Sequence, residues 1–233
     1  MSASISLNFR MTSKNGSEDQ TVTIENLVIA GWTGRDAEAV EKHIAELEEI
    51  GVQRPSRTPC YYRASVAQLT MDDGIQVIGD NSSGEVEFIL VSLDDGLWVG
   101  LGSDHTDRGV EAFNVAVSKQ MCAKPIAGEL WPMAELEDHW DDIQLRSTLS
   151  VDRMREPYQD GVVANMLAPV ELIKKYRSGS EELLPGTLMF CGTLAVQGGV
   201  RPADAFNAEL VDPVLGREIS FSYDITTLPP EEE

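Results

Sequence analysis

The first 31 residues alternate apolar and polar positions in two short segments, SISLNFRM (residues 4–11) and TVTIENLVIAG (residues 21–31). The segment between them, SKNGSED, is rich in turn-forming residues and contains Asn15-Gly16. Alternation with a period of two is typical of a strand, and Asn-Gly favours a tight hairpin turn. These residues therefore predict a β-hairpin whose loop lies at Asn15-Gly16.

A helix is expected over about residues 35–50, where Asp36 can cap the start and Gly51 can end it. His43 lies at the edge of its apolar stripe and Glu46 one step further out, so both side chains are expected to face the rim of a cleft. The stripe recurs at helical spacing and consists of Ala37, Val40, Ile44 and Leu47. The Pro-rich stretch 54–63 then predicts an irregular hinge.

Short apolar runs separated by turn signals fill most of the remaining chain and predict strands. They are YYRASV, GIQVIG, GEVEFILVSL, GLWVGLGSD, EAFNVAVSK, GTLMFCGTLAV and FNAELVDPVLGREISFSYDI, the last with a hairpin turn at DPVLG. Two helical patches, about 132–142 and 169–179, interrupt them. The pattern predicts a mostly-β (α+β) domain over residues 54–233, preceded by an N-terminal α/β extension, residues 1–53, that consists of the hairpin and the helix.

Charge and composition exclude several classes of protein. The 39 acidic and 18 basic side chains give a formal charge of −21, which repels nucleic-acid phosphates. No stretch approaches the roughly 20 apolar residues that a membrane helix needs, and the N-terminus lacks the apolar run of a signal peptide. The three cysteines, Cys60, Cys122 and Cys191, are too widely spaced to suggest a zinc site or a disulfide framework. A cytoplasmic protein without nucleic-acid or membrane partners is expected.

The segment GEVEFILVSL contains the first candidate metal ligands, Glu85 and Glu87. In a strand, Glu85 and Glu87 lie on one face with Ile89 and Val91, while Val86, Phe88 and Leu90 share the other face. Both faces are apolar further along, so the strand is expected to be buried. Two buried carboxylates repel one another unless a cation joins them, and a divalent cation with oxygen ligands does this well. The alternative is a solvated strand end.

GSDHTDR, residues 102–108, follows a predicted strand and supplies further candidate ligands. Asp104 can complete a set of three carboxylates with Glu85 and Glu87, and Asp107 is the competing ligand. His105 with Asp107 could instead form a zinc hydrolase site. Lys119, at the end of a further apolar run, is either an ordinary exposed lysine or a binding group for a substrate oxyanion beside the metal.

The order of these motifs resembles the core of the fumarylacetoacetate hydrolase superfamily. The elements are E-x-E (Glu85–Glu87), D-x-T (Asp104–Thr106) with Arg108 close behind, Ser118-Lys119, and P-G with a later G-T (Pro185-Gly186 and Gly192-Thr193). YYRAS resembles the family's aromatic-basic segment, with Arg63 where a Lys is usual. The last predicted hairpin also resembles the family, so the resemblance covers roughly residues 54–225.

The resemblance implies a mixed β-roll, commonly dimeric, with Mg²⁺ or Mn²⁺ bound by Glu85, Glu87 and Asp104. Ca²⁺ is a further possibility, because it also takes hard oxygen ligands. It implies that Lys119 and the turn Gly192-Thr193 contact the oxygens of a 2-oxo acid or 1,3-dicarbonyl substrate. Further substrate contacts are expected from Arg63, His105 and Arg108. The helix residues His43 and Glu46 match a catalytic H-x-x-E pair that activates water in several relatives.

Departures from the family pattern indicate a divergent bacterial branch. The spacings from Glu87 to Asp104 and from Asp104 to Lys119 are short, and Leu194 stands where a Pro often follows the Gly-Thr. His139 is interpreted as a surface or structural residue.

The expected function is metal-dependent hydrolysis of a C–C bond in a small 1,3-dicarbonyl or 2-oxo acid through a metal-bound enolate. Alternatives are a decarboxylase, isomerase or hydratase on the same site, C–N cleavage of a cyclic amide, or a non-catalytic binding module stabilised by metal. A homodimer is expected.

Overall fold

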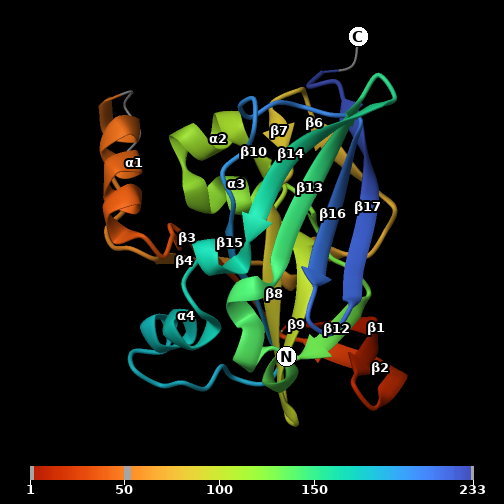
Figure 1. The fold of residues 1–233 in the computed structure, drawn as a ribbon. Helices are drawn as coiled ribbons and strands as arrows, with labels where there is room; N and C mark the ends of the chain where they lie inside the picture. The colour runs from red at the N-terminus through yellow and green to blue at the C-terminus, as the bar shows by residue number, and fades with distance from the viewer. Residues whose placement is uncertain (1–2, 50–53, 232–233) are drawn as a thin grey trace.

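The structure, a computed structural model, describes residues 3–49 and 54–231. Two sheets form its body, and Figure 1 shows helices gathered along one side of them. Within the described residues the larger sheet has eight strands in the order β2-β1-β12-β9-β8-β15-β3-β4. These strands are β2 (Gly16–Ile24), β1 (Ile5–Ser13), β12 (Glu129–Pro132), β9 (Gly96–Ser103), β8 (Val86–Leu93), β15 (Thr187–Thr193), β3 (Asn26–Gly31) and β4 (Cys60–Ala64).

The second sheet has the order β14-β13-β16-β17-β6. Its strands are β14 (Met154–Val162), β13 (Gln144–Val151), β16 (Ala205–Asp212), β17 (Arg217–Leu228) and β6 (Gly74–Ile78). Two short pairs complete the described strands: β10 (Thr106–Asp107) with β7 (Ser82–Ser83), and β11 (Lys124–Pro125) with β5 (Leu69–Thr70). Both sheets are mixed, because β1 runs parallel to β12, β15 to β3, and β17 to β6.

The helices are short apart from the first one. They are α1 (Ala37–Glu49), α2 (Arg108–Phe113), α3 (Val115–Met121) and α4 (Pro169–Tyr176), with the 3-10 helices η1 (Val66–Gln68), η2 (Met133–Glu135), η3 (Glu137–Asp142) and η4 (Val163–Asn165). No helix within residues 3–49 and 54–231 has both the length and the apolar character that crossing a membrane requires.

Two apolar cores cover the two faces of the larger sheet. One core lies between the two sheets and contains Phe88 from β8 and Phe206 from β16. The other covers the opposite face and contains Ile89 from β8 and Phe9 from β1. Strand β8 therefore contributes alternate side chains to both cores, as its uninterrupted apolar run predicts. The mostly-β α+β fold class is confirmed.

The predicted N-terminal elements form, but they are not a separate layer. The hairpin β1–β2 turns at Lys14-Asn15, directly before Gly16. The second predicted segment splits into the end of β2 and strand β3, which inserts between β15 and β4. The division predicted at residue 53 therefore runs through a single sheet.

Helix α1 begins where the sequence predicts. The carboxylate of Asp36 accepts hydrogen bonds from the backbone N–H groups of Glu38 and Ala39, which satisfies two unpaired donors of the first turn. Ile44 is buried and Val40 half-buried, but Ala37 is exposed. The predicted end at Gly51 lies outside the described residues.

The strand predicted over EAFNVAVSK is wrong, because this segment forms the two helices α2 and α3. Asp107 caps α2 by accepting from Val110 N, and Asn114 caps α3 by accepting from Val117 N. Two N-caps seven residues apart start two short helices, and these caps outweigh the alternating pattern between them. A further hairpin, β13–β14, forms where no strands were predicted. The predicted helical patches appear as η2, η3 and α4.

Candidate metal centre

Three strands of the larger sheet bring the candidate carboxylates together. Glu85 directly precedes β8, and Glu87 within β8 lies opposite Gly102 on β9 and Thr193 on β15. Asp104 directly follows β9, and its backbone N–H donates to the Glu85 carbonyl at 3.0 Å. Oxygen atoms of Glu85, Glu87 and Asp104 lie within 4.8 Å of one another, so these three residues could hold a divalent cation.

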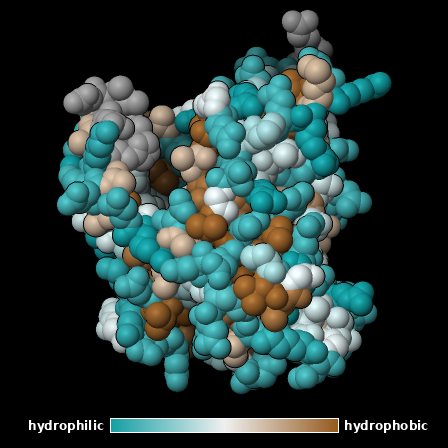
Figure 2. All heavy atoms as spheres, in the orientation of Figure 1, coloured by the Kyte–Doolittle hydropathy of each residue, from teal (hydrophilic) through white to brown (hydrophobic). Residues whose placement is uncertain are grey.

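The three carboxylates differ in their access to solvent. Glu87 is 2% exposed and Asp104 is 1% exposed. The side chain of Glu85 is 16% exposed, so it marks the open side of the cluster. Figure 2 shows the surface hollowed between α1 and the helices α2 and α3, which contact the cluster.

Glu87 carries the least compensated charge of the cluster. One oxygen accepts a hydrogen bond from Gly192 N at 2.7 Å, but Glu87 forms no ion pair within the described residues. Burial, followed by the negative charges of Asp104 and Glu85, raises the pKa of Glu87 well above its ordinary value. A cation bound beside this carboxylate would stabilise its ionised form.

Asp104 faces two lysines. Lys119 Nζ lies 2.7 Å from Oδ2, and Lys124 Nζ lies 3.0 Å from Oδ1. Burial alone would raise the pKa of Asp104, but the two ammonium groups outweigh burial and lower it to about 2. Oδ2 nevertheless makes no hydrogen bond of acceptable geometry among the described residues.

Lys124, which is fully buried, was missed by sequence reasoning. It directly precedes Pro125 in the short strand β11, and no pattern distinguishes it from an exposed lysine. Because a buried ammonium group needs a partner, the neighbouring Asp104 and the carbonyl of His105 account for its position.

An ion-pair network from α2 and α3 covers Glu85. Lys119 lies 3.5 Å from Glu85 and 3.2 Å from Glu111, and Arg108 lies 3.1 Å from Glu85 and 2.8 Å from Glu111. Burial opposes the charged form of Lys119, but Asp104, Glu85 and Glu111 raise its pKa well above the ordinary value. Lys119, which is buried, and Arg108 therefore stay cationic beside Glu85. Glu111 was also missed, because it lies in the segment predicted as a strand.

The charges and donor atoms of this group fit a divalent cation. Its carboxylates are Glu85, Glu87, Asp104 and Glu111, and its cations are Arg108, Lys119 and Lys124. The group thus holds one more negative than positive charge, and the excess lies beside the buried Glu87. Hard oxygen donors with such an excess are the ligand set that Mg²⁺, Mn²⁺ or Ca²⁺ prefers.

Gly192 and Thr193, at the end of β15, contact β8 beside Glu87. Gly192 has a φ of +97°, and a Cβ atom on it would lie 1.7 Å from the hydroxyl oxygen of Thr33. Only glycine fits there, and its N–H is directed at Glu87. The hydroxyl of Thr193 donates to the Val86 carbonyl at 2.7 Å. Both residues hold β8 in position in this structure.

His105 is fully buried, and both of its ring nitrogens have hydrogen-bond partners. Nδ1 lies 3.0 Å from the Tyr223 hydroxyl, and Nε2 lies 2.9 Å from Ser82 Oγ. Burial, with the charges of Lys124 and Arg108, lowers the pKa of His105 to about 3, so the ring is neutral at pH 7. These two hydrogen bonds hold the His105 ring in place, and its substrate contact stays a prediction.

Two further predicted residues, Asp107 and Arg63, have other partners in the structure. Asp107 caps α2 and is not among the described acidic residues that converge with Glu85 and Glu87, so the structure does not assemble a site from Asp107 and His105. Arg63 is exposed on β4 and donates to Asn26 Oδ1 at 2.7 Å. His43 and Glu46 lie on α1, but their side chains lie outside the described part of the structure, so their catalytic role stays a prediction.

Comparison with protein-family models matches residues 30–223 to the family described as "Protein of unknown function (DUF2848)". Among curated proteins the comparison finds no match.

Three solved structures similar to this chain are named as a family protein, a hydrolase and a dehydratase. The yeast fumarylacetoacetate hydrolase family protein ynq8 is 19% identical, with a TM-score of 0.63 and coverage of 90% of this chain and 96% of that chain. A protein from Burkholderia cenocepacia, named as a fumarylpyruvate hydrolase, is 20% identical, with a TM-score of 0.60 and coverage of 95% and 92%. A 2-keto-3-deoxy-D-arabinonate dehydratase is 14% identical, with a TM-score of 0.61 and coverage of 88% and 74%. The predicted resemblance is thus confirmed at the level of the fold.

Proposed function

Starting from the fact that this chain belongs to the DUF2848 family and has the fold of fumarylacetoacetate hydrolase family proteins, we propose that it is a metal-dependent hydrolase. Its substrate would be a small 1,3-dicarbonyl or 2-oxo acid, in which it cleaves a C–C bond. Glu85, Glu87 and Asp104 would hold Mg²⁺ or Mn²⁺, with Ca²⁺ as the alternative.

The observation that carries this proposal is the buried, unpaired Glu87 between two further carboxylates. A carboxylate that only stabilised the fold would be expected to have a cationic partner or to lie in solvent. Glu87 has neither within the described residues, and its two acidic neighbours make ionisation still less favourable. A divalent cation accounts for all three carboxylates at once.

The chemistry divides between the metal and the residues of this chain. A bound divalent cation supplies Lewis acidity, which polarises substrate oxygens and stabilises negative charge that develops on them. Lys119 and Arg108 lie beside Glu85 and would bind and orient the anionic end of the substrate. His43 would accept a proton from water, with Glu46 orienting the imidazole.

Related reactions on the same site are the alternatives. Without a positioned water, the same stabilisation of charge supports decarboxylation, isomerisation or hydration, and one structural relative is named as a dehydratase. Hydrolysis is preferred because another relative is named as a hydrolase and because α1 carries the pair that would activate water.

A panel of acylpyruvates and oxaloacetate, assayed with Mg²⁺ and with Mn²⁺, tests the proposal. We expect turnover that a chelator abolishes and that Glu85→Ala reduces by about a thousandfold while folding is retained. Glu18→Ala, at an exposed position of β2, is the matched control and should keep full activity. Metal that only raises the melting temperature, with no turnover on any compound, would favour a non-catalytic binding module.

We also expect a homodimer, as the sequence resemblance implies, and a cytoplasmic location, as the composition and the widely spaced cysteines suggest. Light scattering after size-exclusion chromatography should then give twice the 25.5 kDa mass of one chain.

A further inference from the structure

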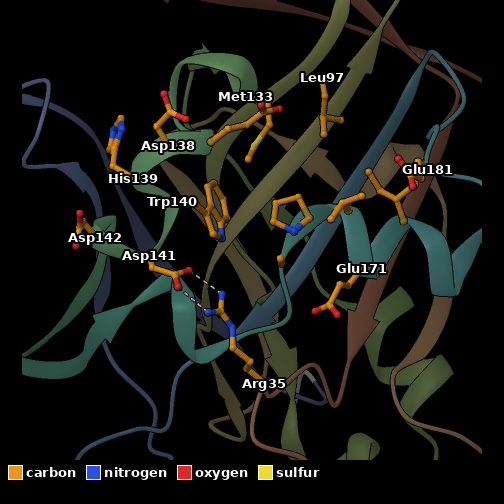
Figure 3. Close-up of a pocket in the computed structure, with 15 residues that line it drawn as sticks. Arg35, Leu97, Met133, Asp138, His139, Trp140, Asp141, Asp142, Glu171 and Glu181 are labelled. Atoms are coloured by element: carbon orange, nitrogen blue, oxygen red, sulfur yellow. Dashed lines mark hydrogen bonds and ion pairs between the residues drawn. The ribbon is translucent and has the colours of Figure 1, made fainter.

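A cavity of about 750 Å³ lies away from the carboxylate cluster, between η3 and α4. Figure 3 shows its lining, and none of the residues proposed for metal binding or catalysis belongs to it. Its volume is within the range of pockets that hold small organic molecules.

The inner wall of the cavity is apolar. Trp140 is 6% exposed, Met133 is 9% exposed and Ile173 is 2% exposed, and Pro169 is also buried. Leu97 of β9 lines the cavity from the larger sheet. This wall would bury the apolar body of a ligand.

The outer rim of the cavity is acidic. Its carboxylates are Glu137, Asp138, Asp141, Asp142, Glu171 and Glu181. Arg35 pairs with Asp141 at 2.9 Å, and Lys174 pairs with Glu181 at 2.7 Å. The other four carboxylates form no ion pair within the described residues. The rim therefore attracts a cation and repels an anion.

Trp140 adds an observation that does not depend on the acidic rim. Its indole nitrogen is buried and has no hydrogen-bond partner within the described part of the chain. Figure 3 shows this nitrogen on the edge of the ring that is turned toward Arg35 and Asp141, inside the circle of lining side chains. A buried N–H without an acceptor is unfavourable, and an acceptor atom of a ligand would satisfy it.

We propose that this cavity binds a small organic amine whose apolar body carries a hydrogen-bond acceptor. The ammonium group lies at the acidic rim, the body packs against Met133 and Ile173, and the acceptor receives the Trp140 N–H. An oxo acid is the wrong ligand, since its carboxylate would face the four unpaired acids. The cavity is thus a second site, independent of the carboxylate cluster and of the reaction proposed there.

Tyramine is a suitable probe, because its ring carries a hydroxyl oxygen at one end and an aminoethyl chain, which ends in an ammonium group, at the other. The chain has four Trp, so a nitrogen-15 spectrum contains four indole N–H signals, and Trp140→Phe identifies the one from Trp140. Titration with tyramine should move that signal and saturate it. Phenethylamine, which lacks the oxygen, should bind about threefold to tenfold more weakly, and 4-hydroxyphenylacetate, which is an anion, should not bind.

Two variants separate the roles of rim and indole. Asp142→Asn with Glu171→Gln should weaken tyramine binding by roughly tenfold, while Glu209→Gln with Glu218→Gln, an equal charge change on the five-stranded sheet, should not. Trp140→Phe, followed by calorimetry, should remove the preference for tyramine over phenethylamine. Absence of tyramine binding at millimolar concentration, equal binding of the anion, or unchanged binding in the rim variant would overturn the proposal.

Discussion

At the scale of single residues, Glu87 is buried, and its carboxylate forms no ion pair with any residue that the structure describes. Asp104 is equally buried but faces Lys119 and Lys124. The pKa of Glu87 is therefore raised, whereas the pKa of Asp104 is lowered. The identity of both residues could be predicted from the E-x-E and D-x-T motifs. Their opposite pKa shifts could not be predicted, because they depend on Lys124, and no sequence pattern identifies Lys124 as a buried residue.

Glu87→Gln should separate metal binding from folding. The amide is neutral, so it avoids the free-energy cost of burying or protonating the Glu87 carboxylate. The metal-free variant should therefore melt at a higher temperature than the metal-free wild type at pH 7, while affinity for Mn²⁺ falls by about a hundredfold or more. Calorimetric titration and thermal melts measure the two effects. Wild-type affinity for Mn²⁺ in this variant would exclude Glu87 as a ligand.

Gly192→Ala should destabilise the protein by about 3 kcal/mol, because the new Cβ atom meets Thr33 and the backbone has a positive φ. Urea denaturation measures the loss. Gly128→Ala is the matched control, since a Cβ atom there meets nothing within 4 Å, and it should leave the midpoint nearly unchanged. Equal midpoints for the two variants would contradict the close packing at Gly192.

At the scale of elements, the short helices α2 and α3 decide what surrounds the carboxylates. They carry Arg108, Glu111 and Lys119, and each begins at a side-chain cap. Sequence reasoning identified Arg108 and Lys119 but placed Lys119 at the end of a strand. Helices of six and seven residues are too short to show a helical period, so only the caps reveal them.

Substitutions at Asp107 test its role as the N-cap of α2 and also whether Asp104 or Asp107 is the third metal ligand. Asp107→Ala should destabilise α2 by about 1 kcal/mol and speed hydrogen exchange across residues 108–113. Asp107→Asn keeps a capping oxygen, so it should preserve both the helix and the affinity for Mn²⁺. If the Asn variant folds normally but loses metal, Asp107 rather than Asp104 is the third ligand.

The elements that the sequence predicts best are those with a strong local signal. The β1–β2 hairpin has Asn15-Gly16, and the β16–β17 turn has DPVLG. The β13–β14 hairpin has no such signal. Its turn residues Asp152 and Arg153 adopt φ values of 50° and 66°, which a hairpin turn usually leaves to Gly or Asn, so their role appears only in the structure.

At the scale of the whole molecule, a buried carboxylate outside the candidate site makes stability depend on pH. Asp212 in β16 is fully buried and accepts hydrogen bonds from the Leu215 backbone, His139 and Arg217. Burial alone would raise the pKa of Asp212, but these bonds outweigh burial and lower it from 3.8. His139 thus has the structural role that the sequence suggested.

The sign of this effect follows from the lowered pKa. Ionised Asp212 stabilises the fold fully above about pH 4, and that contribution disappears as the pH falls through the lowered folded-state pKa. Asp212→Asn should therefore cost about 2 kcal/mol at pH 7 and progressively less in acid. Urea denaturation from pH 2.5 to pH 7 measures this. A destabilisation that stays constant over the whole range would contradict the assignment.

We propose above all that Glu85, Glu87 and Asp104 together hold one divalent cation. A crystal of the protein grown with Mn²⁺ and oxalate, a mimic of an enolate, tests it most directly through the anomalous scattering of the metal. We expect a single strong peak bounded by oxygens of those three residues, with oxalate on the side of Lys119. A peak elsewhere, or no peak beside Glu87 at saturating Mn²⁺, would contradict it.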